Sequence, residues 1–125
     1  AALTIDEALL LEKEAHNLGM DVLVETHTHE EIIMANKLKT RLIGINNRNL
    51  KTMEVDIKNS LKLSKYINTD KIIVAESGLK NYEDLALLNK NGIKNFLIGE
   101  SLMRENDLTS ATKRILGIIN WIVKN

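Results

Sequence analysis

Polar residues that can do chemistry follow two short apolar runs in the first half of the chain. Glu25 ends the run 22–24, and a carboxylate at that point can act as a general acid or base. Asn46 and Arg48 follow the run 42–45, where an amide can hold substrate hydroxyls and a guanidinium can bind phosphate. A solvent-exposed strand end and an ordinary polar loop have the same composition, so the residue types alone leave both interpretations open.

Two turns in the second half of the chain contain glycine directly after an apolar run. Ser77 and Gly78 follow Glu76, and Gly99 precedes Glu100. Glycine lets a ligand approach the backbone closely, and N–H groups that converge at a helix start attract a phosphate dianion. We therefore expect both turns to present free N–H groups at helix starts. A plain structural role is the alternative that the spacing leaves open, because short glycine turns are common.

His27 and His29 lie near several carboxylates, a combination that could indicate a metal site. Two histidines two residues apart at the entry to a helix are not a recurrent ligand spacing, and His29 falls inside a predicted helix cap. We therefore predict no metal site. The sequence contains no cysteine, which excludes disulfides, thiol nucleophiles and metal sites with cysteine ligands.

Helix and strand patterns alternate along the whole chain. Thr-x-x-Glu patterns at Thr4 and Thr28 predict capping boxes, in which the side chains of a helix start satisfy each other's neighbouring N–H groups. Gly92 predicts a helix end. The last helix is expected to begin near Asp107 and to carry a broad apolar face as far as Val123. The remaining predicted elements are helices that begin at Asp56 and Asn81 and strands over 20–25, 42–46, 71–76 and 95–99.

This alternation predicts an α/β fold in which helices cover a parallel sheet. An open doubly wound sheet and part of a (β/α)₈ barrel both fit. The barrel is favoured because every predicted strand ends in polar or glycine residues, which a barrel gathers at one face. The glycine-rich fingerprint of a dinucleotide-binding sheet is absent. A full barrel needs about 250 residues, so we predict half of a TIM (β/α)₈ barrel, four parallel strands alternating with helices, as a single domain over 1–125.

Charge and hydropathy exclude several classes of protein. Lysine plus arginine (17) equals aspartate plus glutamate (17), so no overall field attracts nucleic acid or an anionic membrane. No apolar run reaches the roughly 18 residues needed to span a bilayer, and the start of the chain lacks the pattern of a secretory signal. We expect a cytoplasmic protein that binds neither nucleic acid nor membrane.

Together, the four strand ends resemble the motifs of the indole-3-glycerol phosphate synthase family. The matching segments occur in the family's order and at its spacing, and the second and fourth of them are long and specific. On this alignment the chain contains the family's fourth helix and its fifth to eighth strands. The matching segments are 22–25, 42–50, 74–79 and 97–104.

The resemblance implies a carbon–carbon lyase of tryptophan biosynthesis that uses neither metal nor cofactor. Its small-molecule phosphate-ester substrate, 1-(2-carboxyphenylamino)-1-deoxyribulose 5-phosphate, closes its ring, loses carbon dioxide and then loses water. The implied catalytic residues are Glu25 for acid–base chemistry, Asn46 for the substrate hydroxyls and Glu76 as a second carboxylate. The implied phosphate-binding residues are Arg48, Ser77, Gly78, Gly99 and Glu100, the last through its backbone N–H.

The resemblance also implies what these residues do not carry. The family's general-acid lysine lies on its third strand, so we predict negligible synthase activity for this chain alone. A half barrel leaves strand edges and a sheet face without neighbours, which predicts a homo-oligomer or pairing with the N-terminal half. Trp121 is expected to serve packing or such an interface.

Two other functions remain to be weighed. A non-catalytic half barrel that binds phosphate or assembles with itself would keep the same turns, so the motifs do not separate it from an enzyme. Another phosphate-binding barrel enzyme, such as phosphoribosylanthranilate isomerase, would require different residues at the strand ends.

Overall fold

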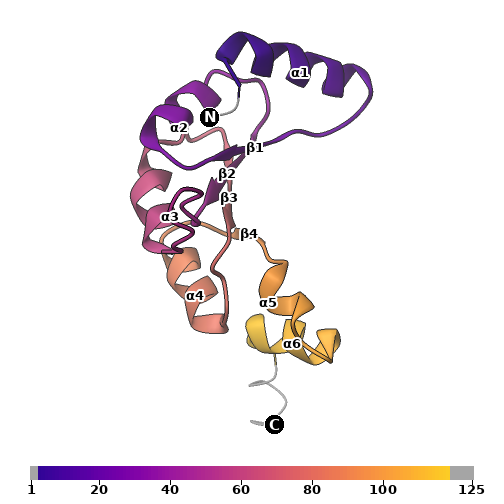
Figure 1. The fold of residues 1–125 in the computed structure, drawn as a ribbon, viewed down its shortest axis with the longest axis vertical. Coiled ribbons are helices and arrows are strands. Elements are labelled where there is room, and N and C mark those ends of the chain that lie inside the picture. Colours follow the sequence, from indigo (N-terminus) through magenta and orange to yellow (C-terminus); the bar gives the residue numbers. More distant parts are fainter. Residues whose placement is uncertain (1–2, 119–125) are drawn as a thin grey trace.

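Four parallel strands form one sheet in the computed structural model, which describes residues 3–118 (Figure 1). The strands lie in the order in which they occur along the chain, and each adjacent pair is parallel. A doubly wound sheet contains a point where this order reverses, and the sheet of the described residues has none. The prediction of half a TIM (β/α)₈ barrel is confirmed. The strands are β1 (Leu23–Thr26), β2 (Leu42–Asn46), β3 (Ile72–Glu76) and β4 (Asn95–Leu97).

Helices alternate with the strands, one before the sheet and at least one after each strand. They are α1 (Ile5–Asn17), α2 (His29–Ala35), α3 (Lys58–Leu63) followed by the 3₁₀ helix η1 (Ser64–Tyr66), α4 (Tyr82–Lys90), α5 (Glu100–Met103) and α6 (Leu108–Ile115). Figure 1 shows α2, α3 and α4 along one side of the sheet, with α1 at one end and α5 and α6 at the other. None of these helices combines the length and apolar content of a membrane-spanning segment.

The strands direct alternate residues to opposite sides of the sheet. Ile43 and Ile45 of β2 are completely buried among side chains of α2 and α3, and Ala75 of β3 is buried against α4. The alternation therefore turns Gly44, Asn46 and Glu76 to the side that these helices do not cover. In a half barrel this uncovered side of the sheet faces the barrel interior, and polar residues at the strand ends can be placed there.

The predicted helix starts at Thr4, Asn81 and Asp107 are confirmed. Each of these side chains accepts the backbone N–H of the residue three positions further on, and the first two complete a capping box. Another prediction about a helix start is wrong. The box at Thr28 is incomplete because the Glu31 carboxylate accepts the backbone N–H of His27 instead.

The last helix is shorter than its apolar pattern predicts. It ends at Ile115 because Gly117 adopts a positive φ of 71°, which closes the helix. A Cβ atom on Gly117 would lie 2.6 Å from the ring of Tyr82, so a glycine is also required by the neighbouring helix. Trp121 and the apolar residues up to Val123 lie outside the described residues.

Helix α1 is held by a buried carboxylate rather than by its leucines. Leu9 and Leu11 are exposed although they are apolar, whereas Glu12 is only 3% exposed. The Glu12 carboxylate accepts the backbone N–H groups of Lys39 (3.0 Å) and Thr40 (2.5 Å) just before β2. A charge that receives two N–H donors can be buried, and it fixes α1 to the sheet.

Replacing Glu12 by alanine is expected to lower the free energy of unfolding by about 2–3 kcal/mol, because the buried N–H of Thr40 and the partly buried N–H of Lys39 lose their acceptor. Urea denaturation followed by circular dichroism measures this loss. The matched control is Glu14→Ala on the exposed side of the same helix, for which a change within about 0.5 kcal/mol is expected. Equal losses in the two variants would contradict the role given to Glu12.

Candidate active site

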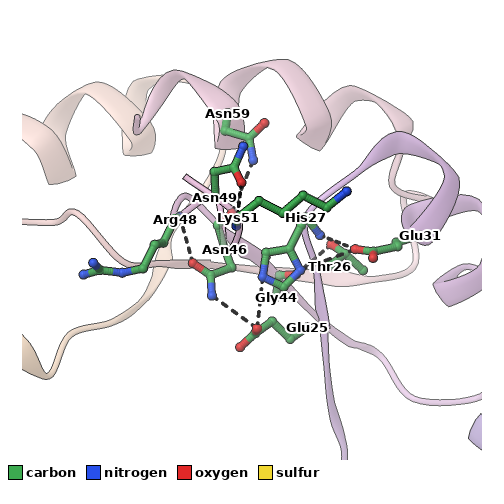
Figure 2. Close-up of polar contacts among 10 residues, drawn as sticks. All are labelled: Glu25, Thr26, His27, Glu31, Gly44, Asn46, Arg48, Asn49, Lys51 and Asn59. Atoms are coloured by element: carbon green, nitrogen blue, oxygen red, sulfur yellow. Dashed lines mark hydrogen bonds and ion pairs between the residues drawn. The ribbon is translucent and has the colours of Figure 1, made fainter. Parts of the chain in front are cut away.

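The strand register brings the predicted catalytic residues to one place. Glu25 pairs in register with Gly44, and Asn46 pairs with Glu76, so all four lie on the same side of the sheet. Asn46 Nδ2 donates a hydrogen bond to Glu25 Oε1 at 3.2 Å (Figure 2). Sequence position alone predicted this convergence, and the contact between the amide and the carboxylate shows it directly.

Asn46 is fixed by its own neighbours. Its side-chain oxygen Oδ1 accepts the backbone N–H of Arg48 at 2.9 Å, and its carbonyl accepts Asn59 Nδ2 at 3.3 Å (Figure 2). Because Oδ1 is already an acceptor, the Nδ2 group is the part of the amide that points to Glu25. This arrangement sets the amide's orientation before any ligand binds.

Glu25 and Glu76 form a carboxyl pair. Glu76 is 4% exposed, and its side chain lies over Gly44, where an added Cβ atom would be 2.0 Å from Glu76 Oε1. The pKa of Glu76 is raised from 4.5 to about 7, first by burial and then by a hydrogen bond to Glu25 and the negative charge of Glu25. When Glu25 and Glu76 are both ionised, no proton lies between them and Glu76 Oε1 has no hydrogen-bond donor. Near neutral pH the pair is therefore disposed to share one proton.

Arg48 binds a carboxylate at the far end of the site. Its Nη2 atom lies 2.7 Å from Glu100 Oε2, while Glu100 Oε1 lies 2.7 Å from Arg104 Nη2. The contact joins the loop after β2 to the turn after β4, two segments 52 residues apart. Figure 2 shows the Arg48 side chain pointing away from Glu25. The guanidinium expected to bind phosphate and the turn expected to donate N–H groups are thus side by side.

Asn47 positions the turn that contains Ser77. The sequence did not predict this role. It is 3% exposed, its N–H donates to the carbonyl of Glu76 at 2.8 Å, and its Nδ2 donates to the carbonyl of Ser77 at 3.1 Å. Its Oδ1 accepts both the N–H (3.0 Å) and the hydroxyl (2.8 Å) of Ser60. An asparagine within a polar loop carries no sequence pattern that distinguishes this buried role from an exposed one.

The turn after β3 is strained, and it is not a helix start. Ser77 and Gly78 have positive φ angles of 65° and 74°, and α4 begins only at Tyr82. The expectation that this turn opens a helix is wrong, since Asn81 caps that helix instead. The turn after β4 agrees with expectation, because Gly99 directly precedes α5. Ser101 Oγ donates to the Leu79 carbonyl at 2.6 Å and ties the two turns together.

Gly78→Ala is expected to lower the free energy of unfolding by about 2–3 kcal/mol, since φ is positive and the new Cβ would lie 2.2 Å from Val55 Cγ1. Thermal and urea unfolding measure the effect. Gly92→Ala is the matched control, because φ there is 86° but no atom lies within 4 Å of the new Cβ. The control is expected to cost only the conformational part, about 1 kcal/mol. Equal costs would contradict the proposed contact with Val55.

A pocket of about 1250 Å³ lies beside these strand ends. Its lining includes Glu25, His27, Asn46 and Arg48, but Glu76 and both glycine turns lie outside the lining. The site therefore has an accessible part and a carboxyl group behind it. Among residues 3–118 no cluster of three or more histidine, cysteine or acidic side chains could hold a metal ion.

Comparison with known sequences gives consistent matches. The family model for indole-3-glycerol phosphate synthase matches residues 1–115. The indole-3-glycerol phosphate synthase of Magnetococcus marinus is 49% identical over 117 residues, which cover 94% of this chain and 44% of that protein. That of Azospirillum brasilense is 47% identical over 116 residues, covering 93% of this chain and 44% of that protein. The chain thus spans less than half the length of the curated relatives it matches.

Two solved structures share the fold. The crystal structure of the Amycolatopsis orientalis BexX/CysO complex superposes with a TM-score of 0.62 at 13% identity, covering 86% of this chain and 45% of that one. A structure described as native KDPGal superposes with a TM-score of 0.66 at 17% identity, covering 90% and 54%. At such low identity these two likenesses concern the fold alone.

Proposed function

The chain belongs to the indole-3-glycerol phosphate synthase family, and on this premise we propose that it supplies the C-terminal half of that enzyme's active site. The observation that carries the proposal is the cluster of Glu25, Asn46 and Glu76 at the strand ends, with Arg48 beside the turn after β4. The family assignment supports the reaction proposed below, and the cluster supports a part for these strands in it. The enzyme acts in the cytoplasm on a small phosphate ester.

In the proposed reaction the ketone carbon of the substrate condenses on the anthranilate ring. Carbon dioxide and then water leave, which yields indole-3-glycerol phosphate. Glu25 exchanges protons with the reacting atoms, because its carboxylate lines the pocket and is 48% exposed. Asn46 holds the substrate hydroxyls and orients Glu25. Glu76 keeps its proton up to about neutral pH, and its protonated form can stabilise the charge of Glu25.

The phosphate group of the substrate binds at Arg48 and the two glycine turns. Arg48 provides a guanidinium, which can bind two phosphate oxygens at once. Ser77, Gly78, Gly99 and Glu100 provide backbone N–H groups. Because the Glu100 side chain contacts Arg48, substrate binding requires this carboxylate to move aside.

Catalysis requires a general acid from the N-terminal half of the barrel. The match covers 44% of each of the two relatives described above. The family's catalytic lysine lies on its third strand, and the resemblance places only the fifth to eighth strands in this chain. We propose that the 125-residue chain alone has negligible activity and that the completed barrel is active.

The sheet edges and exposed leucines favour association. Within the described residues β1 and β4 each have a neighbour on one side only, and Leu10, Leu18 and Leu97 are more than half exposed. We expect self-association of the isolated chain at micromolar concentrations, measured by light scattering. Addition of the N-terminal half is expected to replace it by a one-to-one complex. A monomer at every concentration would contradict this expectation.

Growth of a tryptophan-requiring bacterium without its own synthase tests the function. Cells that express this chain together with the N-terminal half of the Magnetococcus marinus relative are expected to grow without tryptophan. Cells that express either part alone are expected to grow only when tryptophan is supplied. Failure of the co-expressing cells, with both proteins present and soluble, would favour a non-catalytic half barrel that binds phosphate or assembles with itself.

A further inference from the structure

The ring of His27 lies between two carboxylates at the edge of the site. Its Nε2 atom is 3.3 Å from Glu25 Oε1, and its Nδ1 atom is 3.4 Å from Glu31 Oε2 (Figure 2). The side chains of His27 and Glu31 are 22% and 17% exposed, so both are shielded from solvent. Nε2 is buried and faces Glu25. The alignment of the two groups falls short of a hydrogen bond.

Glu31 is held in place by the start of α2. Its carboxylate accepts the backbone N–H of His27 at 2.6 Å, and its own N–H donates to Thr28 Oγ1 at 3.3 Å. This is why Glu31 does not complete the capping box expected at Thr28. The acceptor on the Nδ1 side of His27 is thus fixed by the junction of β1 and α2 rather than by a free side chain.

A histidine between two carboxylates favours their ionised forms, because either nitrogen can donate and a protonated ring is positive. Glu25 therefore has two partners that favour its negative charge, His27 and the amide of Asn46. Glu76 has neither, since among residues 3–118 no ion pair reaches it and its Oε1 atom has no donor. The two carboxyl groups of the pair have opposite environments.

We propose that His27, held by Glu31, is a positioning residue that keeps Glu25 as the charged member of the carboxyl pair, so that their shared proton lies on Glu76. The role within the pair follows from these contacts, and its value for catalysis rests on the proposed function. A pair with fixed roles presents one carboxylate that is ready to accept a proton and a second group that is already protonated.

Within residues 3–118, the other charged groups near the carboxyl pair are bound elsewhere or form no ion pair with it. From β2 the pair is faced by Gly44 and Asn46, which are uncharged. Arg48 is bound to Glu100. The further charged side chains that line the pocket are Lys51, Glu54, Asp56, Lys58 and Lys62, and none of them forms an ion pair with Glu25 or His27 within the described part of the chain.

The test is a pH titration of the glutamate side-chain carbons by ¹³C NMR in the 125-residue chain. In the unaltered chain, the protonation step near pH 7 is expected to appear almost wholly on the Glu76 carboxyl carbon. In His27→Asn the amide cannot carry a charge, and the step is expected to divide between the two carbons, with at least about a twofold larger share on Glu25. Glu31→Gln is expected to move the shares in the same direction by a smaller amount.

His29→Asn is the matched control, because His29 lies two residues away and its ring contacts Tyr66 at a centroid distance of 4.1 Å instead of the pair. Its shares are expected to equal those of the unaltered chain. Amide spectra establish whether each variant is folded. If His27→Asn does not fold, the titration of Glu31→Gln tests the proposal in its place. Unchanged shares in the folded variants would overturn the proposal. A changed share in a barrel that never turns over substrate would overturn the proposed function and leave the role of His27 standing.

Discussion

Replacing Glu25 by glutamine is expected to lower turnover of the completed barrel by roughly 10²–10⁴-fold, the contribution typical of a general acid or base. Glutamine has the same shape as glutamate and can still contact Asn46 Nδ2, but it neither accepts nor releases a proton at neutral pH. The loss is therefore expected in kcat, with a much smaller change in KM. Steady-state kinetics of the chain mixed with the N-terminal half measure it.

Glu105→Gln is the matched control for this loss. It also removes one carboxylate from an ion pair, because Glu105 lies 2.9 Å from Arg114, but that pair joins the segment between α5 and α6 to α6. Turnover of this variant is expected to stay within about twofold of the unaltered chain. Full activity of Glu25→Gln would contradict the role given to Glu25.

Replacing Glu76 by glutamine is expected to stabilise the chain at pH 8 and to change little at pH 5. Folding raises the pKa of Glu76 to about 7. Between about pH 4.5 and 7 the folded state therefore binds more protons than the unfolded state. Its favourable contribution is present below pH 4.5 and is lost as the pH rises through about 7. The shift corresponds to up to roughly 3 kcal/mol at pH 8, and glutamine removes this cost because it stays neutral.

Urea unfolding at pH 5 and pH 8 measures the effect as the difference between Glu76→Gln and the unaltered chain. Taking this difference cancels the other groups that titrate in the same range. The control is Glu83→Gln, an exposed carboxyl in the first turn of α4, for which the two pH values are expected to give the same difference. Equal stabilisation by Glu76→Gln at both pH values would contradict the raised pKa.

The fold could be predicted from the sequence because its local patterns agree with one another. The apolar runs and the caps at Thr4, Asn81 and Asp107 set the element order, and the polar strand ends indicated a barrel rather than a doubly wound sheet. The position of Glu25 beside Asn46 also followed, since parallel strands end at the same edge. These are properties of neighbouring residues and of strand direction.

Contacts between distant side chains could not be predicted in the same way. Helix α1 has an amphipathic sequence, yet its anchor is Glu12, because two N–H groups before β2 lie within its reach. In the sequence, His27 was notable only because its spacing from His29 does not suit a metal site. Its place between Glu25 and Glu31 depends on where β1 passes into α2. Only the three-dimensional arrangement tells which polar group meets which.

Synthase turnover of the purified chain, before and after mixing with the N-terminal half of a relative, tests the central claim most directly. Intact mass of each sample establishes first that the chain has all 125 residues and that no full-length synthase is present. We predict no measurable turnover by the chain alone and clear turnover on mixing, with a loss when Glu25→Gln is mixed instead. Turnover by the chain alone, or none on mixing with a folded partner, would contradict the account.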